Sequence, residues 1–392
     1  MFLKNSVKIL HTADWHLGLI SWQRLVGIDR RGEQREALRH MIQVARREQV
    51  DLIVHSGDLF HQYNQPPRPA IELAVETIMQ LRSIAPVVWV VGNHDWYAMG
   101  ALREAFSPDV LILREFTPVE LPDLPVTVFP LPYISLSKFL GGKTGVEIQE
   151  QARQKMLNIF RAWERSMKDS RWNVLAAHFT LEECAWYSQA NSVRELFLKS
   201  VDFPVGMHYG AFGHLHAFIH YCKSRFPIVY PSPLVRDTFQ QEKEKTGCVI
   251  VDLTEGKQTH VKHISLPSVK LVTVDVEEDA DVLKVTREAE EMSEGKEAYV
   301  RFCVKSVGIP LQLRSRLASL GGTHWQTVAV HSVFPSPAES TGDQREGSMD
   351  IQAIPELFSG FCRSMGLPER IAGLFRRYYQ EAAEEEGRDA SG

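Results

Sequence analysis

The chain has 392 residues, 44% hydrophobic and 24% charged, a composition typical of a globular protein with two or three domains. Its net charge of -5 argues against a histone-like protein that coats nucleic acid by bulk positive charge, although a local basic groove is compatible with it. Five widely spaced cysteines without a CxxC pair, no signal peptide and no long apolar run predict a protein of the reducing cytoplasm that does not enter a membrane.

Residues 1–266 repeat one pattern, a short apolar run followed by a polar turn and often by an amphipathic helix. Nearly continuous apolar runs are typical of strands that are buried on both faces. We expect such strands at 7–10, 51–57, 87–93, 126–132, 173–178, 209–214, 227–232 and 248–253. Apolar residues at helical spacing predict helices at 35–49, 69–83 and 147–168. The pattern therefore predicts an α/β domain with a large core.

The remaining chain changes in texture. Residues 267–333 indicate a small α/β domain with the order β-α-β-α-β, and residues 334–350 collect Pro, Ser, Gly and charge without periodicity, as a linker does. Residues 351–386 indicate two short amphipathic helices, with apolar faces formed by Leu357, Phe358, Phe361 and Met365 and by Ile371, Leu374, Phe375 and Tyr378. This helix pair either packs on its own protein or docks on a partner.

Side chains of the kinds that bind metals follow five of the expected strands. They are Asp14 and His16, then Asp58, then Asn93, His94 and Asp95, then His178, and finally His214 and His216. In an open α/β sheet, ligands bind at the carboxyl ends of the strands. Taken singly, each segment has an ordinary explanation, such as a turn at Gly57-Asp58. Five in order, each directly after a strand, indicate one shared site.

The mixture of carboxylate, amide and imidazole groups, without a thiolate, suits Mn²⁺, Fe²⁺ or Zn²⁺. There are more candidate ligands than one ion needs, and two ions that share a carboxylate can activate an in-line attack on phosphorus. Asp14 and His16 are two residues apart, so in an extended segment both would project to the same side. Trp15 would then point away from them and pack in the core.

The segments DWH (14–16), GDLF (57–60), GNHD (92–95), AAH (176–178) and GHLH (213–216) resemble the signature of the calcineurin-like metallophosphoesterase superfamily. Within it, HTADWHLG (11–18) is similar to the opening of SbcD-type DNA-repair exonucleases. The resemblance covers nearly the whole chain. It implies a four-layer α-β-β-α sandwich over 1–266, a small α/β cap domain over 267–333, a linker over 334–350 and a C-terminal helix pair over 351–386.

The resemblance also implies the role of each candidate residue. One metal would be held by Asp14, His16 and His216, the other by Asn93, His178 and His214, with Asp58 as the bridge. His94 would be the catalytic histidine, and Asp95 would orient it through its other ring nitrogen. The implied cofactor is a pair of divalent ions, with Mn²⁺ preferred and Fe²⁺ or Zn²⁺ as alternatives.

For function, the resemblance implies a metal-dependent phosphodiesterase, a DNA exonuclease or endonuclease of DNA repair and recombination. The resemblance implies DNA and an SbcC-like, SMC-type coiled-coil ATPase as partners, the ATPase bound to the C-terminal helices. ATP hydrolysis would come from that partner, because this chain has no G-x-x-x-x-G-K-[ST] motif. A homodimer would form through the helix expected at 69–83.

Other functions stay open at this point. A phosphoesterase for cyclic nucleotides, other small phosphoesters or phosphoproteins would share the metal site, because a fold does not settle the substrate. The expected cap favours DNA, since its Arg301, Lys305, Arg314 and Arg316 could contact phosphates, although they could equally be a solvated face. A non-catalytic scaffold would lack a ligand or His94, and neither is missing.

Two departures from the family pattern concern the substrate path. Position 61 is His where many relatives carry Asp, and the loop 179–195, FTLEECAWYSQANSVRE, matches no loop of the family. No metal ligand is lost, so we expect activity, while these departures leave the DNA path and the substrate preference open.

Overall fold

The computed structural model describes residues 6–23, 25–95, 110–136, 145–187, 195–306 and 308–333, together with positions 102, 359, 370, 373 and 374. The chain divides into two compact units, Met1–Lys270 and Leu271–Gly392. The linker predicted at 334–350 lies outside the described residues. The helix pair predicted at 351–386 does too, apart from four isolated positions.

The first unit contains two six-stranded sheets. One has the order β14 (His260–Ser265), β13 (Gly247–Thr254), β1 (Ser6–Thr12), β4 (Leu52–His55), β5 (Val87–Val90) and β6 (Val110–Leu113). The other has the order β11 (Phe218–Tyr221), β12 (Ile228–Pro231), β10 (Tyr209–Gly213), β9 (Trp172–His178), β8 (Val126–Leu131) and β7 (Val119–Glu120). A two-stranded ribbon, β2 (Ile20–Ser21) and β3 (Ile28–Asp29), follows β1. All eight strands expected from the sequence are present.

The strands that lead to the candidate site are parallel within each sheet. In the first sheet, β1, β4, β5 and β6 run in one direction. In the second sheet, β8, β9, β10 and β12 do the same. Parallel neighbours bring their carboxyl ends to one edge of a sheet, where polar side chains can meet.

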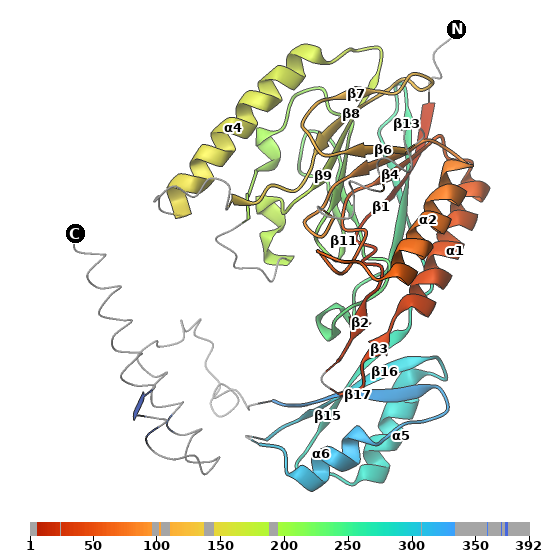
Figure 1. Cartoon of the computed structure of the whole chain (residues 1–392), viewed down its shortest axis with the longest axis vertical. Helices are drawn as coiled ribbons and strands as arrows, with labels where there is room; N and C mark the ends of the chain where they lie inside the picture. The colour runs from red at the N-terminus through yellow and green to blue at the C-terminus, as the bar shows by residue number, and fades with distance from the viewer. Residues whose placement is uncertain are drawn as a thin grey trace. The chain divides into compact units, whose positions relative to one another are not determined.

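Helices cover the outer faces of the two sheets. The helices α1 (Arg31–Glu48) and α2 (Arg68–Arg82) lie side by side on the first sheet, and α4 (Gly145–Ser166) lies beyond the second (Figure 1). All three predicted helices are therefore present. The layers follow the order α-β-β-α, so the predicted sandwich is confirmed.

The strands read as continuous apolar runs because alternate residues belong to different cores. In β4, Ile53 packs toward the helices α1 and α2, whereas Leu52 and Val54 pack between the two sheets. In β9, Val174 packs between the sheets and Leu175 packs toward α4. A strand that is buried on both faces has no polar side to alternate with its apolar one.

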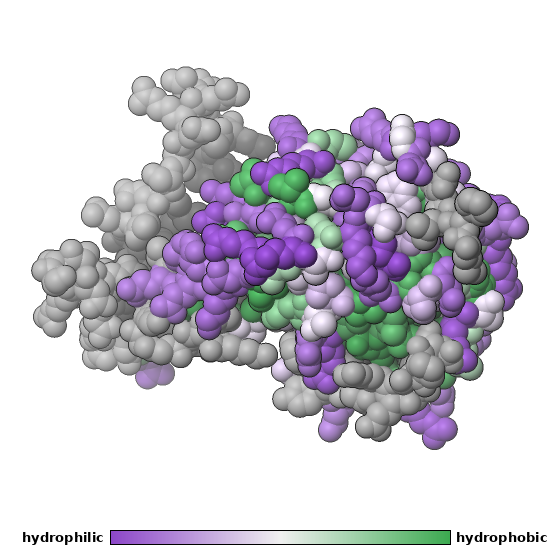
Figure 2. Space-filling model, turned by 90° about the horizontal axis from the view of Figure 1, so that it is seen from above, coloured by the Kyte–Doolittle hydropathy of each residue, from purple (hydrophilic) through white to green (hydrophobic). Residues whose placement is uncertain are grey.

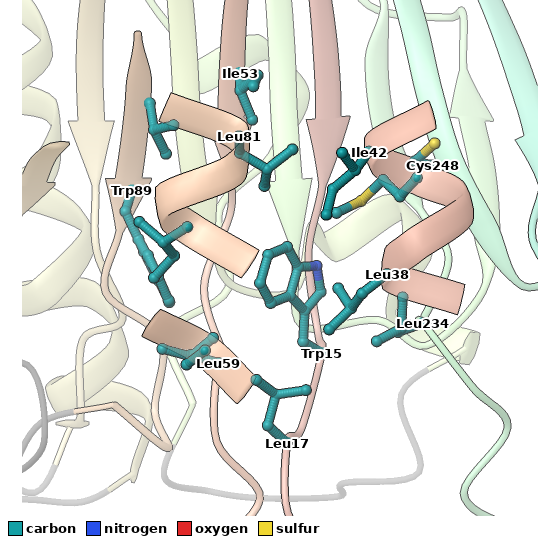
Figure 3. Packing of buried hydrophobic residues seen from close by; sticks show 14 of the residues in the cluster. Trp15, Leu17, Leu38, Ile42, Ile53, Leu59, Leu81, Trp89, Leu234 and Cys248 are labelled. Atoms are coloured by element: carbon teal, nitrogen blue, oxygen red, sulfur yellow. The ribbon is translucent and has the colours of Figure 1, made fainter. Parts of the chain in front are cut away.

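Trp15 lies in the core beneath α1 and α2, as expected. Its side chain is 1% exposed, its Nε1 donates to Thr12 Oγ1 at 2.8 Å, and its ring meets the Trp89 ring at a centroid distance of 6.2 Å. Figure 3 shows Trp15 with Leu38 and Leu17 close by. The buried indole therefore anchors the backbone that carries Asp14 and His16.

The second unit contains a three-stranded sheet with the order β15 (Lys270–Val276), β16 (Ala298–Val304) and β17 (Trp325–Ser332). The helices α5 (Val282–Ser293) and α6 (Leu311–Ala318) connect these strands, which gives the β-α-β-α-β order that the sequence predicts. Asp281 caps α5, because its carboxylate accepts the N–H of Leu283 at 3.0 Å. Val274, Val300 and Phe302 lie in the core of this unit.

Hydrophilic side chains cover much of the visible described surface, with hydrophobic patches between them (Figure 2). On α2, the helix expected to form a dimer, Ile71 is 36% and Met79 48% exposed. Within the ranges given above, no helix is both long and apolar enough to cross a membrane.

A buried histidine links the two sheets beneath the candidate site. The ring nitrogens of His11 lie 2.8 Å from the hydroxyl of Tyr209 and 3.1 Å from Oγ of Ser56, and Ser56 Oγ donates to the carbonyl of Ala211 at 2.9 Å. Burial lowers the pKa of His11 to about 3, so the ring stays neutral in the folded protein.

This linkage makes the stability of the first unit sensitive to acid. The unfolded chain binds a proton at His11 near pH 6.5, whereas the folded chain resists it down to about pH 3. The neutral His11 ring therefore contributes its full share to the free energy of unfolding above pH 6.5. As the pH falls this free energy decreases, by about 2 kcal/mol at pH 5. Urea unfolding followed by tryptophan fluorescence should show that the free energy of unfolding decreases less between pH 7 and pH 5 in His11→Gln than in the unchanged protein. The control His260→Gln, at an exposed position, should show the same decrease as the unchanged protein. An equal decrease in both variants would contradict the prediction.

Candidate metal centre

Five strand ends bring the candidate ligands together. Asp14 and His16 follow β1, Asp58 follows β4, Asn93 follows β5, His178 ends β9, and His214 and His216 follow β10. The loops after β1 and β4 run side by side, because Asp14 N donates to Gly57 O at 2.9 Å and His16 N donates to Asp58 O at 3.1 Å. The backbone thus sets the spacing between the first two ligand segments.

These segments leave the strands through unusual backbone conformations. Asp14 has φ 53°, His16 φ 45°, Asp58 φ 59° and His214 φ 93°, all in the left-handed region that non-glycine residues rarely adopt. Asp14 and His16 therefore do not lie in an extended segment, and the expectation that strand alternation aims them is wrong. A strained turn aims them, and such strain gathers at functional sites.

The first cluster consists of Asp14, His16 and His216, whose ligand atoms lie within 4.8 Å of one another. Nε2 of His16 lies 3.0 Å from Nε2 of His216, and the latter lies 3.9 Å from Oδ1 of Asp14. In addition, the Asp14 carboxylate accepts the backbone N–H of His214 at 3.1 Å, which ties β1 to β10.

The second cluster contains Asn93, His178 and His214. Oδ1 of Asn93 lies 2.9 Å from Nε2 of His178 and 3.1 Å from Nδ1 of His214. His178 and His214 also form a compact group with Asp58. The two clusters have the same members as the two ligand sets that the family resemblance implies.

Asp58 lies between the clusters. Its Oδ2 is 3.6 Å from Nε2 of His16, and its Oδ1 is 3.4 Å from Nε2 of His178. The residue is 2% exposed, and His178 and other nearby histidines hold the pKa of its carboxyl well below the usual range although burial opposes this. One ionised carboxylate therefore faces both clusters with different oxygens.

The hydrogen bonds of His178 show that this arrangement needs a positive species. Its Nδ1 donates to the carbonyl of Ser56 at 2.6 Å, which leaves Nε2 facing the oxygens of Asn93 and Asp58. A proton or a cation must occupy this position. Burial disfavours charge on the ring, but Asp58 and Asp14 outweigh it and raise the pKa of His178 to about 9. A metal ion would displace that proton, as metal binding to histidine generally does.

Acidic residues stand behind two of the other histidines. Nε2 of His214 lies 3.3 Å from Oε1 of Glu195, and Nδ1 of His216 lies 3.6 Å from Oδ2 of Asp237. A carboxylate behind a histidine fixes its tautomer and raises the basicity of the inner nitrogen. His214 and His216 each direct one ring nitrogen toward the ligand clusters and the other toward a carboxylate. The donor set therefore fits divalent cations.

His94 and Asp95 do not form the pair that was expected. A ring nitrogen of His94 lies close to His16 and Asp58, while its Nδ1 donates to the carbonyl of His61 at 2.7 Å. Asp95 instead accepts three backbone N–H groups, from Asp58, Leu59 and Gly92, at 2.8–2.9 Å. The expectation that Asp95 orients His94 is therefore corrected: Asp95 holds the Asp58 loop, and the backbone of residue 61 orients His94.

Sequence reasoning missed the residues behind the ligands. Glu195 and Asp237 come from loops without a recognised motif. The only signal was the general rule that a metal-binding histidine needs an acceptor behind it. That rule does not say which acidic residue supplies it.

Close packing around Asp58 depends on a glycine. A Cβ at Gly92 would clash with the carboxylate and the backbone N of Asp58, and neither can retreat because Asp95 holds that backbone. We predict that Gly92→Ala weakens Mn²⁺ binding, measured by calorimetry, by about 10–100-fold, as loss of a supporting contact at a metal site typically does.

The matched control is Gly32→Ala on α1, because a Cβ there would meet nothing within 4 Å. It should bind Mn²⁺ like the unchanged protein. Unaltered Mn²⁺ affinity in Gly92→Ala would show that the position of Asp58 does not matter for the ions.

Comparisons of the sequence with known proteins identify a family. The family model for calcineurin-like phosphoesterases matches residues 7–218, more than half of the chain. The SbcD subunit of the nuclease SbcCD from Staphylococcus epidermidis is 27% identical over 68% of this chain and 72% of its own length. The protein of the same name from Escherichia coli is 23% identical over 67% of this chain and 68% of its own.

A third relative, the DNA double-strand break repair protein Mre11 of Sulfurisphaera tokodaii, is 25% identical over 78% of this chain and 75% of its own length. The matched family region contains all five ligand segments, from Asp14 to His216. The chain therefore belongs to the calcineurin-like phosphoesterase family and is a metal-dependent phosphodiesterase.

Proposed function

We propose that the protein is a two-metal DNA nuclease subunit, an exonuclease and endonuclease that acts in DNA repair together with an SbcC-like coiled-coil ATPase. One observation carries the two-metal part of the proposal. The two oxygens of Asp58 face different histidine clusters at 3.4 and 3.6 Å, as a carboxylate that bridges two ions would.

In this proposal one ion is held by Asp14, His16 and His216, and the other by Asn93, His178 and His214, with Asp58 shared. Mn²⁺ is the preferred ion, because carboxylate, amide and imidazole ligands suit it, and Fe²⁺ or Zn²⁺ are alternatives. Bound divalent ions would lower the pKa of a water molecule and stabilise negative charge on the phosphate.

His94 serves in this proposal as the catalytic histidine that touches the phosphodiester. Its Nδ1–H is engaged with the carbonyl of His61, so Nε2 is the nitrogen left to hold or release a proton. That nitrogen would hydrogen-bond the phosphate oxygens and the leaving oxygen as charge develops on them. Asp95 supports the reaction only through the loop that carries Asp58.

DNA as the substrate is supported by the names of the relatives, two called nucleases and one a double-strand break repair protein. The second unit offers basic residues for phosphate contacts. Lys305 pairs with Glu277 at 3.0 Å and Arg301 bonds Thr273, whereas Arg314 and Arg316 are exposed on α6. The two exposed arginines are the better candidates for contact with the DNA backbone.

The partner proposal rests on the relatives' names, which describe them as one subunit of the nuclease SbcCD. We place the ATPase-binding site on residues 351–386 and a homodimer contact on α2, where Ile71 and Met79 are exposed. We place the protein in the cytoplasm. Its five cysteines are widely spaced and include no CxxC pair, which suits a reducing compartment.

The proposal predicts degradation of DNA by the purified protein with Mn²⁺. His94→Asn should cut linear duplex and single-stranded DNA at least about 100-fold more slowly, because it removes a proton-transfer group. Calorimetry should show nearly unchanged Mn²⁺ binding in this variant, because His94 is not a ligand in either cluster.

His260→Asn, at an exposed position on β14, is the control and should keep full activity. A phosphopeptide and a cyclic nucleotide should be tested beside the DNA substrates. Cleavage of either without any cleavage of DNA would reject the nuclease in favour of a small-molecule or protein phosphatase.

A further inference from the structure

A cavity of about 450 Å³ opens directly beside the metal centre. His214 and His216, one from each histidine cluster, form part of its wall, and Trp186 and Tyr187 form another part. The volume is in the range of pockets that receive small ligands, roughly 300–1,000 Å³. A group in this cavity would therefore lie next to a phosphate bound at the metals.

Carboxylates dominate the charged groups in the described wall of the cavity. Glu195, Asp237 and Glu244 contribute carboxylates to the wall, and the described residues that line it include no lysine or arginine. Glu195 and Asp237 also face the outer nitrogens of His214 and His216. These carboxylates favour an uncharged occupant over an anionic one in this wall.

Two aromatic rings indicate a flat occupant. Trp186 is 74% exposed although it is large and apolar, and its ring stacks on Tyr187 with a centroid distance of 3.7 Å and an interplanar angle of 33°. Tyr187 packs in turn against the core next to α4. The tyrosine therefore supports the indole, and Trp186 remains largely exposed in the wall of the cavity.

Polar groups for the edge of a flat ring are close by. Thr238 and Gln240, both exposed, belong to the same wall. The 3-10 helix Phe239–Gln241 holds this wall in place, because Gln241 contacts His216 and accepts the backbone N–H of Asp237 at 3.0 Å. Hydroxyl and amide groups can both donate to and accept from a heterocycle.

We propose that this cavity receives a nucleobase of the DNA strand being cut, which stacks on Trp186 while its phosphate lies at the metals. The proposal rests on the nuclease function proposed above and deepens it. A base that is paired and stacked in a duplex cannot enter a separate cavity, so the base must be unpaired. The protein would therefore prefer strand ends whose last nucleotides are single-stranded or frayed.

Trp186 and Tyr187 belong to the 3-10 helix Glu182–Tyr187, outside the five ligand segments. A base-stacking site here would make the preference a property of this wall rather than of the metal ligands. Stacking of a base on an aromatic side chain is sequence-tolerant, because every base has a π-face.

The test compares single-stranded oligonucleotides whose terminal two nucleotides at either end are normal or abasic. The unchanged protein should cleave the normal end about tenfold faster in kcat/KM than the abasic end, the effect of losing one base–aromatic stack. Trp186→Ala should cleave both at the lower rate, Trp186→Phe should keep most of the preference, and Mn²⁺ affinity should be the same in all three proteins.

The control is Val205→Ala, which alters an exposed apolar residue (63% exposed) away from this wall and should keep the full preference. The same preference in Trp186→Ala as in the unchanged protein would overturn the proposal. Weaker Mn²⁺ binding in Trp186→Ala would overturn it too, because Trp186 would then support the metal centre rather than a base.

If the unchanged protein cuts no DNA at all, the nuclease proposal fails, and the cavity is judged by binding alone. The probe is then 2-aminopurine nucleoside monophosphate, whose fluorescence is quenched when the base stacks. Quenching by the unchanged protein but not by Trp186→Ala would support a base site, and no quenching by either protein would reject it.

Discussion

The carboxylate of Asp58 is buried between two histidine clusters and turns a different oxygen toward each. Much of the surrounding structure maintains this position. The Asp58 residue has a left-handed backbone, Asp95 accepts the N–H groups of the loop, and Gly92 leaves the space that the carboxylate fills. Hydrogen bonds that are buried and fully formed can hold such a strained conformation.

The two sheets position the remaining candidate ligands around Asp58. Loops after β1, β4 and β5 carry one half of the site, while the end of β9 and the loop after β10 carry the other. His11 joins the two sheets below the site through Tyr209 and Ser56, and the carbonyl of Ser56 fixes the ring of His178. The metal centre therefore depends on the packing of one sheet against the other.

The sequence was sufficient to predict eight strands and three helices of the first unit and the five polar segments that the structure brings together. Strands buried on both faces produce continuous apolar runs, and ligands at the carboxyl ends of parallel strands follow those runs directly. It was not sufficient for the conformation of Asp14 and His16, because strand alternation ends at Thr12 and a left-handed turn begins. The partner of Asp95 could not be predicted either, since a carboxylate next to a histidine in sequence can turn to the backbone instead.

Contacts between segments that are distant in the chain could not be predicted from the sequence for a different reason. Glu195 reaches His214 and Asp237 reaches His216 from loops whose lengths and turns have no periodic signal. The same loops form the cavity beside the metal centre, where acidic groups face the histidines and Trp186 is exposed. Metal chemistry is thus encoded in short motifs, while the surroundings of the substrate are encoded in irregular segments.

The central claim is that the Asp58 carboxylate is a ligand of two metal ions. The most direct test is a crystal structure of the protein with Mn²⁺, in which anomalous scattering locates the ions. The account predicts two peaks, one among Asp14, His16 and His216 and one among Asn93, His178 and His214, each next to a different oxygen of Asp58. A single peak, or two peaks of which only one contacts Asp58, would contradict it.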